Sequence, residues 1–204
     1  MPPVGKAWCI GLTGGIACGK STVGRMLEEL GAYRIDADEL AHRVLRAREV
    51  AQRVARRWPR VATPAGGIDR RRLGEIVFAD PGERRALEAI VHPPVRELLR
   101  RELAAARAAV VVAEVPLLFE SGLEGWFDRI WAVTATPDQQ LARLTGQGLS
   151  LDQARRRLAA GLPPAHKARR AHAVIDNSGS LERTREQVER LWGELGAPGP
   201  EEGE

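Results

Sequence analysis

The sequence has little of several residue types, and each shortage excludes a class of protein. Only two of its 204 residues are cysteine, which excludes the disulfide framework of a small secreted domain and favours a reducing cytoplasm. No apolar run has the length of a membrane span, and Met1–Lys6 lead straight into an apolar stretch without the pattern of a signal peptide. We therefore expect a cytoplasmic protein without a membrane partner.

Aromatic side chains that could stack on bases are also scarce, with one Tyr and three Phe. The chain is nevertheless basic, with a net charge of +4 and a pI near 9.7. A basic protein can bind nucleic acid, but arginine is equally suited to an anionic small substrate. Because the arginines are spread over many segments and stacking residues are few, we expect a small-molecule substrate and no nucleic-acid partner.

Lysine is the third scarce residue, with three lysines beside 28 arginines. One of the three, Lys20, lies in the segment Gly14–Ser21, which fits the pattern G-x-x-x-x-G-K-[ST] at every fixed position. An apolar run at Trp8–Leu12 predicts a buried strand before it, and helical spacing over Val23–Leu30 predicts a helix after it. Strand, glycine-rich turn and helix are the context that a phosphate-binding loop requires.

The residue types of this loop match the chemistry of a nucleoside triphosphate. Glycines let backbone N–H groups approach phosphate oxygens, and the start of a helix favours negative charge. Lysine supplies a compact charge for the β- and γ-phosphates, and the Ser21 hydroxyl can ligate Mg²⁺. The alternative is a glycine-rich turn that precedes Lys-Ser by chance. The predicted nucleotide-binding residues are Gly14, Gly15, Ile16, Ala17, Cys18, Gly19, Lys20, Ser21 and Thr22.

Three acidic residues, Asp36, Asp38 and Glu39, follow the second predicted strand at 32–35. Asp36 and Glu39 match a capping box, which gives Asp36 a structural role at the start of a helix. Asp38 would lie in the first helical turn, near the carboxyl end of a strand, and His42 lies four residues further on. A carboxylate there could accept a proton from an attacking hydroxyl. A solvated aspartate favoured by the helix dipole is the alternative, and the spacing leaves both open.

The segment 40–109 is predicted to be mostly helical, with a loop near 59–67. About 75 residues between the second and third strands exceed what a crossover needs, so this insertion is a candidate substrate-binding subdomain. It contains Arg70, Arg71 and Arg72 and the sequence Val91-His92-Pro93. The alternatives are arginines on a solvated helix surface and a histidine that only caps or packs.

The rest of the chain predicts three more strands. Val110–Val115 contains Glu114, a carboxylate suited to support magnesium, and strands at 129–134 and 173–175 follow. Two capped helices between these last strands predict a mobile lid at 140–170. We expect an α/β fold: a P-loop three-layer domain at 7–196 with a five-stranded, mostly parallel sheet, the insertion, the lid, and a disordered tail at 197–204.

The residues resemble the dephospho-coenzyme A kinase family over about Trp8–Leu195. Any one motif after the phosphate loop is weak, but all in this order are specific. The resemblance implies ATP-dependent phosphorylation of the 3′-hydroxyl of dephospho-CoA, the last step of coenzyme A synthesis, with Mg²⁺. The matching segments are GLTGGIACGKS at 11–21, DADELAH at 36–42, IDRRRLGEIVF at 68–78, LEAIVHP at 87–93, VPLLFESGL at 115–123 and VIDNSGS at 174–180.

Carried over position by position, the resemblance assigns further roles. It makes Lys20, Arg143 and the base Asp38 the catalytic residues, and it implies that Arg143 meets the phosphates. Asn177 and Gly179 match the loop near the adenine of ATP. The segments that face dephospho-CoA contain Asp38, His42, Arg72, His92, Pro116 and Leu118.

Some positions depart from the family pattern. Ala17 and Cys18 replace Gly-Ser in the loop, where side chains are tolerable because the backbone binds phosphate. Gln147 replaces a lid arginine, and Arg155 or Arg157 is a candidate substitute; Gly161 replaces a glutamine.

Three other functions compete with this one. Another P-loop small-molecule kinase would share the fold. A GTPase switch lacks support because the chain has no Asn-Lys-x-Asp motif, and its D-x-x-G at 176–179 comes too late. A nucleic-acid module would rest on the arginines and would show salt-sensitive binding. The sequence does not predict the oligomeric state.

Overall fold

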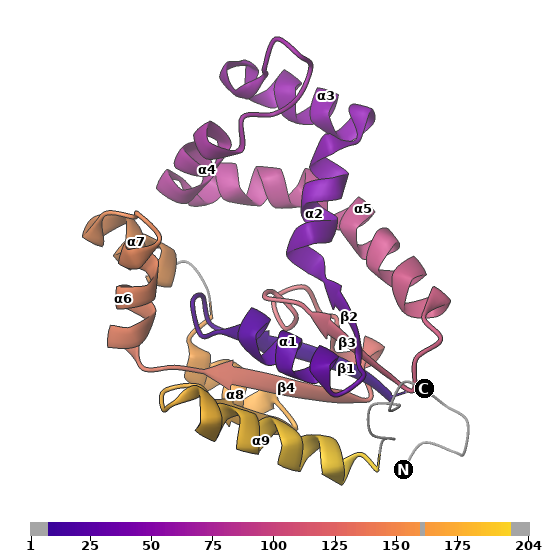
Figure 1. Ribbon diagram of the computed structural model, residues 1–204. Coiled ribbons are helices and arrows are strands. Elements are labelled where there is room, and N and C mark those ends of the chain that lie inside the picture. The colour runs from indigo at the N-terminus through magenta and orange to yellow at the C-terminus, as the bar shows by residue number, and fades with distance from the viewer. Residues whose placement is uncertain (1–7, 160–161, 197–204) are drawn as a thin grey trace. The chain divides into compact units, whose positions relative to one another are not determined.

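The computed structural model describes residues 8–159 and 162–196, so the predicted tail at 197–204 lies outside the described residues. The chain divides into two compact units (Figure 1). The sheet unit consists of the chain up to Asp36 and from Ala105 onward, and the helical unit is Ala37–Ala104.

The sheet unit contains five strands in the order β2-β3-β1-β4-β5. Every pairing between these strands is parallel, where the sequence predicted a mostly parallel sheet. β3 is buried at every position, which explains its unbroken apolar run: both faces of a parallel sheet are covered. The strands are β1 (Trp8–Gly14), β2 (Tyr33–Asp36), β3 (Val110–Glu114), β4 (Arg129–Thr134) and β5 (Ala173–Asp176).

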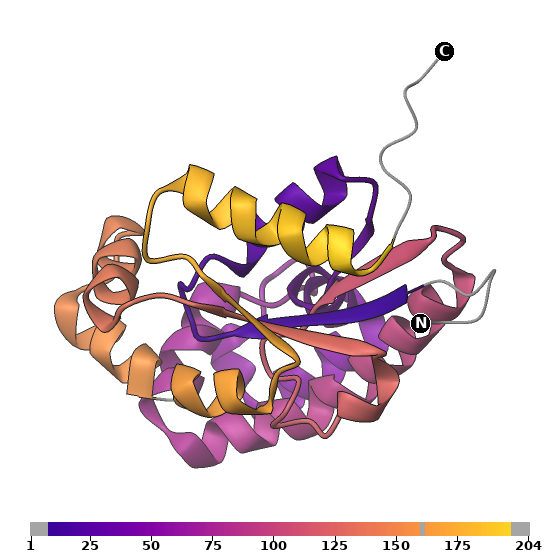
Figure 2. The same cartoon turned by 90° about the horizontal axis from the view of Figure 1, so that it is seen from below.

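Helices cover both faces of this sheet. Figure 2 shows α1 (Lys20–Glu29) and α9 (Leu181–Glu194) on one face and α8 (Pro164–Arg170) on the other. A core of apolar side chains lies between the sheet and the helices α1 and α9. It includes Ile10, Leu12, Val23, Leu27, Val112, Val133, Ile175 and Val188.

Two capped helices, α6 (Pro137–Gly146) and α7 (Leu151–Ala159), follow β4. The capping boxes predicted at their starts are confirmed: Thr136 and Gln139 bond each other's backbone, and Ser150 and Gln153 do the same. The third helix in this region, α8, was not predicted. A 3₁₀ turn, η2 (Glu124–Trp126), precedes β4.

The helical unit forms its own core. Val44, Val54, Trp58, Val77 and Val91 are among its buried side chains. The Asp80 carboxylate accepts hydrogen bonds from the N–H groups of Gly82 and Glu83 and so caps the last helix of the unit, as predicted. The elements are α2 (Ala37–Arg46), α3 (Arg48–Arg57), η1 (Pro59–Val61), α4 (Arg70–Ala79) and α5 (Pro81–Ala105).

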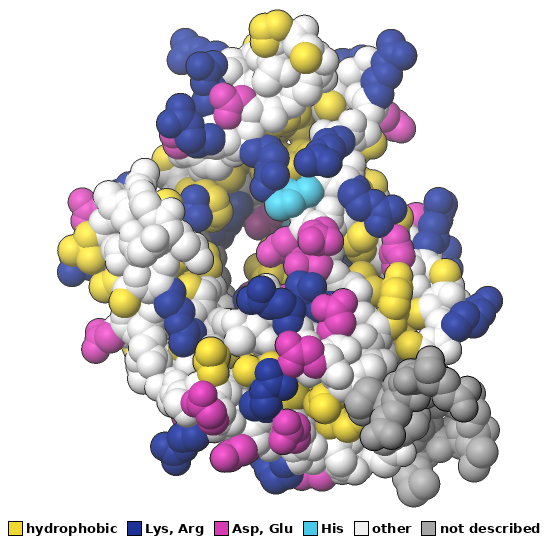
Figure 3. Space-filling view, viewed as in Figure 1, with side chains coloured by type: hydrophobic (Ala, Val, Ile, Leu, Met, Phe, Trp, Pro, Cys, Tyr) yellow, Lys and Arg dark blue, Asp and Glu magenta, His cyan; other side chains and the backbone are white. Residues whose placement is uncertain are grey.

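None of the helices within the described residues combines the length and the apolar character that a membrane crossing requires. α5 has 25 residues but carries charged side chains throughout. Figure 3 shows Lys and Arg side chains dispersed over the visible face, with Asp and Glu among them.

Candidate active site

The phosphate loop connects the carboxyl end of β1 to the first residue of α1, as the sequence predicted. Gly19 has a φ of 94° directly before the helix, and a Cβ there would lie 2.0 Å from Nδ2 of Asn177. Only glycine fits this position. Ala17 also has a positive φ, 55°, which costs a residue with a Cβ about 1–2 kcal/mol. The loop therefore holds a strained turn at its tip.

Five consecutive carbonyl groups of this loop accept hydrogen bonds from protein side chains. Each of the four donating side chains comes from α1, from α6 or from the segment after β5. Lys20 Nζ donates to the carbonyls of Gly14 (3.4 Å) and Gly15 (3.0 Å), Gln140 Nε2 to Ile16 (2.7 Å), Arg143 Nη1 to Ala17 (3.0 Å), and Asn177 Nδ2 to Cys18 (2.8 Å).

These hydrogen bonds fix the direction of the loop amides. Because C=O and N–H point in opposite directions in a trans peptide, binding of the carbonyls turns the N–H groups of the same peptides to the other side. The N–H of Cys18 is partly used, since it donates to Gly15 O at 3.4 Å. With the amino end of α1 beside them, the amides form a concave site for an anion.

The side chain of Cys18 points away from this anion site. It is fully buried, and its Sγ lies 3.0 Å from Nε2 of Gln140. Burial raises the pKa of the Cys18 thiol, although Lys20 nearby acts in the opposite direction. A buried, protonated thiol is unreactive at neutral pH, so Cys18 fills space behind the loop.

Arg143 and Asn177 both hold the loop from behind. The second terminal nitrogen of Arg143, Nη2, donates to the carbonyl of Asn177 at 3.0 Å. The Asn177 side chain is buried, and its Oδ1 accepts a hydrogen bond from Thr184 at 3.0 Å. Gly179 is exposed two residues further along. Contacts of these residues with ATP remain predictions.

Ser21 and Glu114 meet at the other end of the loop. The Ser21 hydroxyl donates to Oε2 of Glu114 at 3.0 Å, and Glu114 is only 3% exposed. Arg34 donates to Oε1 of the same carboxylate at 2.5 Å. The Glu114 carboxylate, whose charge is balanced by Arg34, therefore lies beside Ser21, the predicted metal ligand.

Two predicted acceptor-binding residues follow β3 in the sheet unit. The carbonyl of Pro116 accepts hydrogen bonds from Lys167 Nζ at 2.5 Å and from Thr13 Oγ1 at 3.3 Å. The side chain of Leu118 is fully buried. The carbonyl of Pro116 is therefore already paired within the protein, and the Leu118 side chain is not exposed to a ligand.

The other four predicted acceptor residues belong to the helical unit. Asp38 is exposed in the first turn of α2. His42 contacts Arg70 through its Nε2. His92 is half-buried in α5, which continues through the two following prolines. Arg72 pairs with Asp69, the residue that caps α4.

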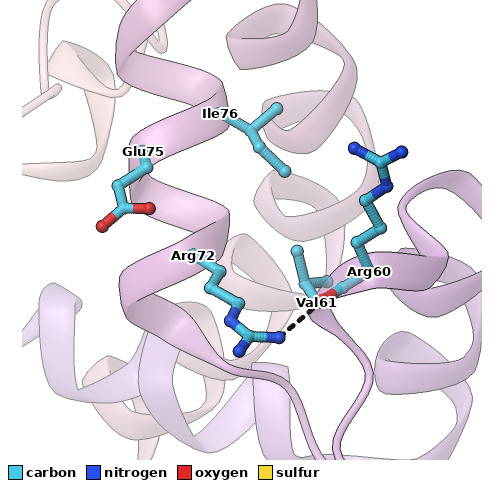
Figure 4. A pocket seen from close by; sticks show the side chains of 5 residues that line it. All are labelled: Arg60, Val61, Arg72, Glu75 and Ile76. Atoms are coloured by element: carbon cyan, nitrogen blue, oxygen red, sulfur yellow. Dashed lines mark hydrogen bonds between the residues drawn. The ribbon is translucent and has the colours of Figure 1, made fainter.

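Arg72 also lines a pocket of about 570 Å³ within the helical unit (Figure 4). Its guanidinium points toward the carbonyl of Arg60, 3.5 Å from Nη1. Val61 and Ile76 supply apolar surface, while Glu75 points away from both arginines. The pocket therefore combines two cations with an apolar wall.

Comparison with known proteins decides the family. A family model described as dephospho-CoA kinase matches residues 8–183. The dephospho-CoA kinase of Symbiobacterium thermophilum is 50% identical over 200 residues, which cover 93% of this chain and 84% of that protein. The chain belongs to the dephospho-CoA kinase family. This family phosphorylates dephospho-CoA with ATP in the final step of coenzyme A biosynthesis, and the chain is an ATP-dependent transferase.

Solved structures agree with this placement in the dephospho-CoA kinase family. A crystal structure of a Thermus thermophilus protein has a TM-score of 0.78 at 38% identity, covering 93% of this chain and 99% of that one. Dephospho-CoA kinase from Campylobacter jejuni has a TM-score of 0.66 at 30% identity, covering 91% and 96%.

Two departures from the dephospho-CoA kinase pattern fall within 140–170, the segment predicted to be a lid. Gln147 is exposed at the end of α6, and Arg155 is exposed on α7. The second departure, Gly161, lies outside the described residues.

Sequence reasoning missed several residues that shape the site. Gln140, Thr184 and Arg34 are common residue types, and their partners lie far away in the chain. Lys167 had a usable signal: it is one of three lysines in an arginine-rich chain, and it is buried with its Nζ 2.8 Å from Glu120.

Proposed function

We propose that the phosphate loop binds the β- and γ-phosphates of ATP, that Lys20 stabilises the phosphoryl group during transfer to the 3′-hydroxyl of dephospho-CoA, and that Arg143 acts by holding the loop through the carbonyl of Ala17. The observation that carries this proposal is the set of five carbonyl groups held by side chains. A loop whose carbonyls are bound in this way presents donors to an anion before the anion arrives. Such preorganisation suits phosphoryl transfer, which depends on positioning and charge stabilisation.

Ser21 is the proposed protein ligand of Mg²⁺. The described residues contain no cluster of three or more His, Cys, Asp or Glu that could hold a metal. Magnesium commonly binds through one or two protein oxygens together with substrate phosphates, and the Ser21 hydroxyl beside Glu114 fits this arrangement. When bound, the ion neutralises charge on the β- and γ-phosphates.

Asp38 is the proposed base, and the helical unit is the proposed binding site for dephospho-CoA. Asp38 is exposed in the first turn of α2, and a carboxylate can accept a proton from a substrate hydroxyl. Residues 140–170 are proposed to close over ATP as a lid. We also propose a cytoplasmic location, which suits Cys9 and Cys18 because neither forms a disulfide.

The pocket around Arg72 is proposed to take the anionic diphosphate and the adjoining apolar arm of dephospho-CoA. We expect Arg72→Leu to raise the KM for dephospho-CoA about tenfold, because a charge-assisted hydrogen bond is lost. The KM for ATP should stay unchanged. Arg71→Leu is the matched control, since Arg71 is an exposed neighbour on the same helix that does not line the pocket. Equal effects of the two variants would count against this assignment.

A coupled ADP-release assay tests the function as a whole. Dephospho-CoA, adenosine, AMP and gluconate are offered in parallel at equal concentration with ATP and Mg²⁺. We expect dephospho-CoA to be phosphorylated with a kcat/KM at least 100-fold above the others, because only it carries a diphosphate and an arm for the Arg72 pocket. A preference for any other acceptor contradicts the proposal.

A further inference from the structure

Three acidic residues gather around Arg34 in the sheet unit. Asp36 and Glu114 are register partners at the carboxyl ends of β2 and β3, so two carboxylates lie side by side. Arg34 precedes Asp36 by two residues and therefore points to the same face of the sheet. Its guanidinium lies between the two carboxylates.

The contacts of Arg34 are close and partly buried. Nε lies 2.5 Å from Oε1 of Glu114, and Nη2 lies 3.3 Å from Oδ2 of Asp36. Glu28 on α1 lies at 3.9 Å. The Arg34 side chain is 19% exposed. With Ser21 donating to Oε2, both oxygens of Glu114 have a donor.

Gly24 provides the space for this arrangement. It lies inside α1, where glycine costs about 1 kcal/mol relative to alanine. A Cβ at this position would lie 2.0 Å from Oε1 of Glu114 and 3.0 Å from Nε of Arg34. Gly24 therefore lowers the stability of α1 but leaves room for the Glu114 carboxylate and the Arg34 guanidinium.

These contacts determine how Glu114 can act toward a metal ion at Ser21. A carboxylate held by donors on both oxygens accepts the hydroxyl proton of Ser21 and directs the oxygen lone pairs outward. It is also kept from ligating the ion directly. We propose that Arg34 is a positioning residue that holds Glu114 on the Ser21 hydroxyl and outside the coordination sphere of the metal. This inference rests on the proposed role of Ser21 as metal ligand.

The test measures how tightly Mn²⁺ binds to the full chain saturated with ADP. Mn²⁺ replaces Mg²⁺ because the electron paramagnetic resonance signal of free Mn²⁺ can be followed during the titration. In Arg34→Gln, Glu114 loses its cation and can turn to the metal, so the Kd for Mn²⁺ should fall about tenfold. The kcat should fall as well, because Ser21 loses its orientation. Arg34→Lys keeps the charge and should restore most of the parent Kd.

The matched control is Arg185→Gln, which removes an arginine of α9 that pairs with Glu29 of α1. It should leave the Kd for Mn²⁺ unchanged. The double variant Arg34→Gln/Glu114→Gln should lose the gain in affinity, because the carboxylate that would bind the metal is absent. A Kd in Arg34→Gln within twofold of the parent, or a gain that persists in the double variant, overturns the inference.

Two further variants keep the result interpretable. If Arg34→Gln does not fold, Glu114→Gln still decides when it is combined with Ser21→Ala. The inference predicts that Glu114→Gln raises the Kd for Mn²⁺ about 10–100-fold in the parent but less than about threefold when added to Ser21→Ala, whereas loss of a direct ligand would raise it about tenfold or more in both. Ser21→Ala should weaken Mn²⁺ binding. If Ser21→Ala leaves the Kd for Mn²⁺ unchanged, the proposed metal site fails together with the inference. If Ser21→Ala raises the Kd while Arg34→Gln leaves it unchanged, only the inference fails.

Discussion

Replacement of Lys20 by alanine is expected to abolish phosphoryl transfer and to leave the fold intact. The ammonium group neutralises charge on the β- and γ-phosphates, and removal of such a group at a preorganised site costs about 3 kcal/mol or more, at least 100-fold in rate. The hydrogen bonds from Lys20 to the carbonyls of Gly14 and Gly15 are lost as well, each worth about 1 kcal/mol, which a unit with a large apolar core tolerates. Single-turnover kinetics and a thermal melt measure the two expectations.

Lys20→Arg is the informative companion of this variant. It retains the charge, but the planar guanidinium has a different shape and a longer reach than the ammonium. We expect it to be nearly as poor as Lys20→Ala. Near-normal turnover of Lys20→Ala with a normal melting curve would remove the lysine from the mechanism.

Replacement of Asp38 by asparagine is expected to lower kcat by about 10²–10⁴, the range for loss of a general base. Asparagine keeps the shape and polarity of the side chain, so stability should change little. Binding of dephospho-CoA should persist, because the loss falls on the transition state. Isothermal calorimetry with dephospho-CoA and steady-state kinetics separate the two effects.

Asp36→Asn is the matched control for this variant, two residues away. The carboxylate of Asp36 is engaged by Arg34 at 3.3 Å, and asparagine can still accept that hydrogen bond. We therefore expect a change in kcat below tenfold and a modest loss of stability, since the ion pair is only partly buried. A well-folded but inactive Asp36→Asn beside an active Asp38→Asn would reverse the assignment and make Asp36 the base.

The sequence predicted the features that depend on local backbone chemistry. The phosphate loop was recognisable because left-handed and closely approached positions such as Gly19 restrict the choice of residue. The capping boxes at Thr136 and Ser150 were recognisable because the first N–H groups of a helix need side-chain acceptors, which the box supplies within three residues. The strands followed from apolar runs, and the exclusively parallel order was a small step beyond the mostly parallel sheet that was predicted.

What the sequence could not predict depends on contacts between distant positions. Gln140 and Ile16 are 124 residues apart, and Arg34 and Glu114 are 80 apart, so no spacing rule connects them. α8 was missed because it is only seven residues long and begins at the second of two consecutive prolines, which leaves no helical period to read. The burial of Leu118 depends on the close approach of Gly11 on β1.

The helical unit is a single uninterrupted segment, Ala37–Ala104, inserted between two neighbouring strands of a sheet that it does not interrupt. The chain enters and leaves it once each, and it folds around apolar side chains of its own. A segment of this kind can be exchanged as a cassette without cutting a strand. Such an exchange would carry away the proposed base and every acceptor contact proposed within Ala37–Ala104, while the nucleotide loop stayed in place. Acceptor choice and nucleotide use could therefore diverge independently during evolution, or be recombined by design.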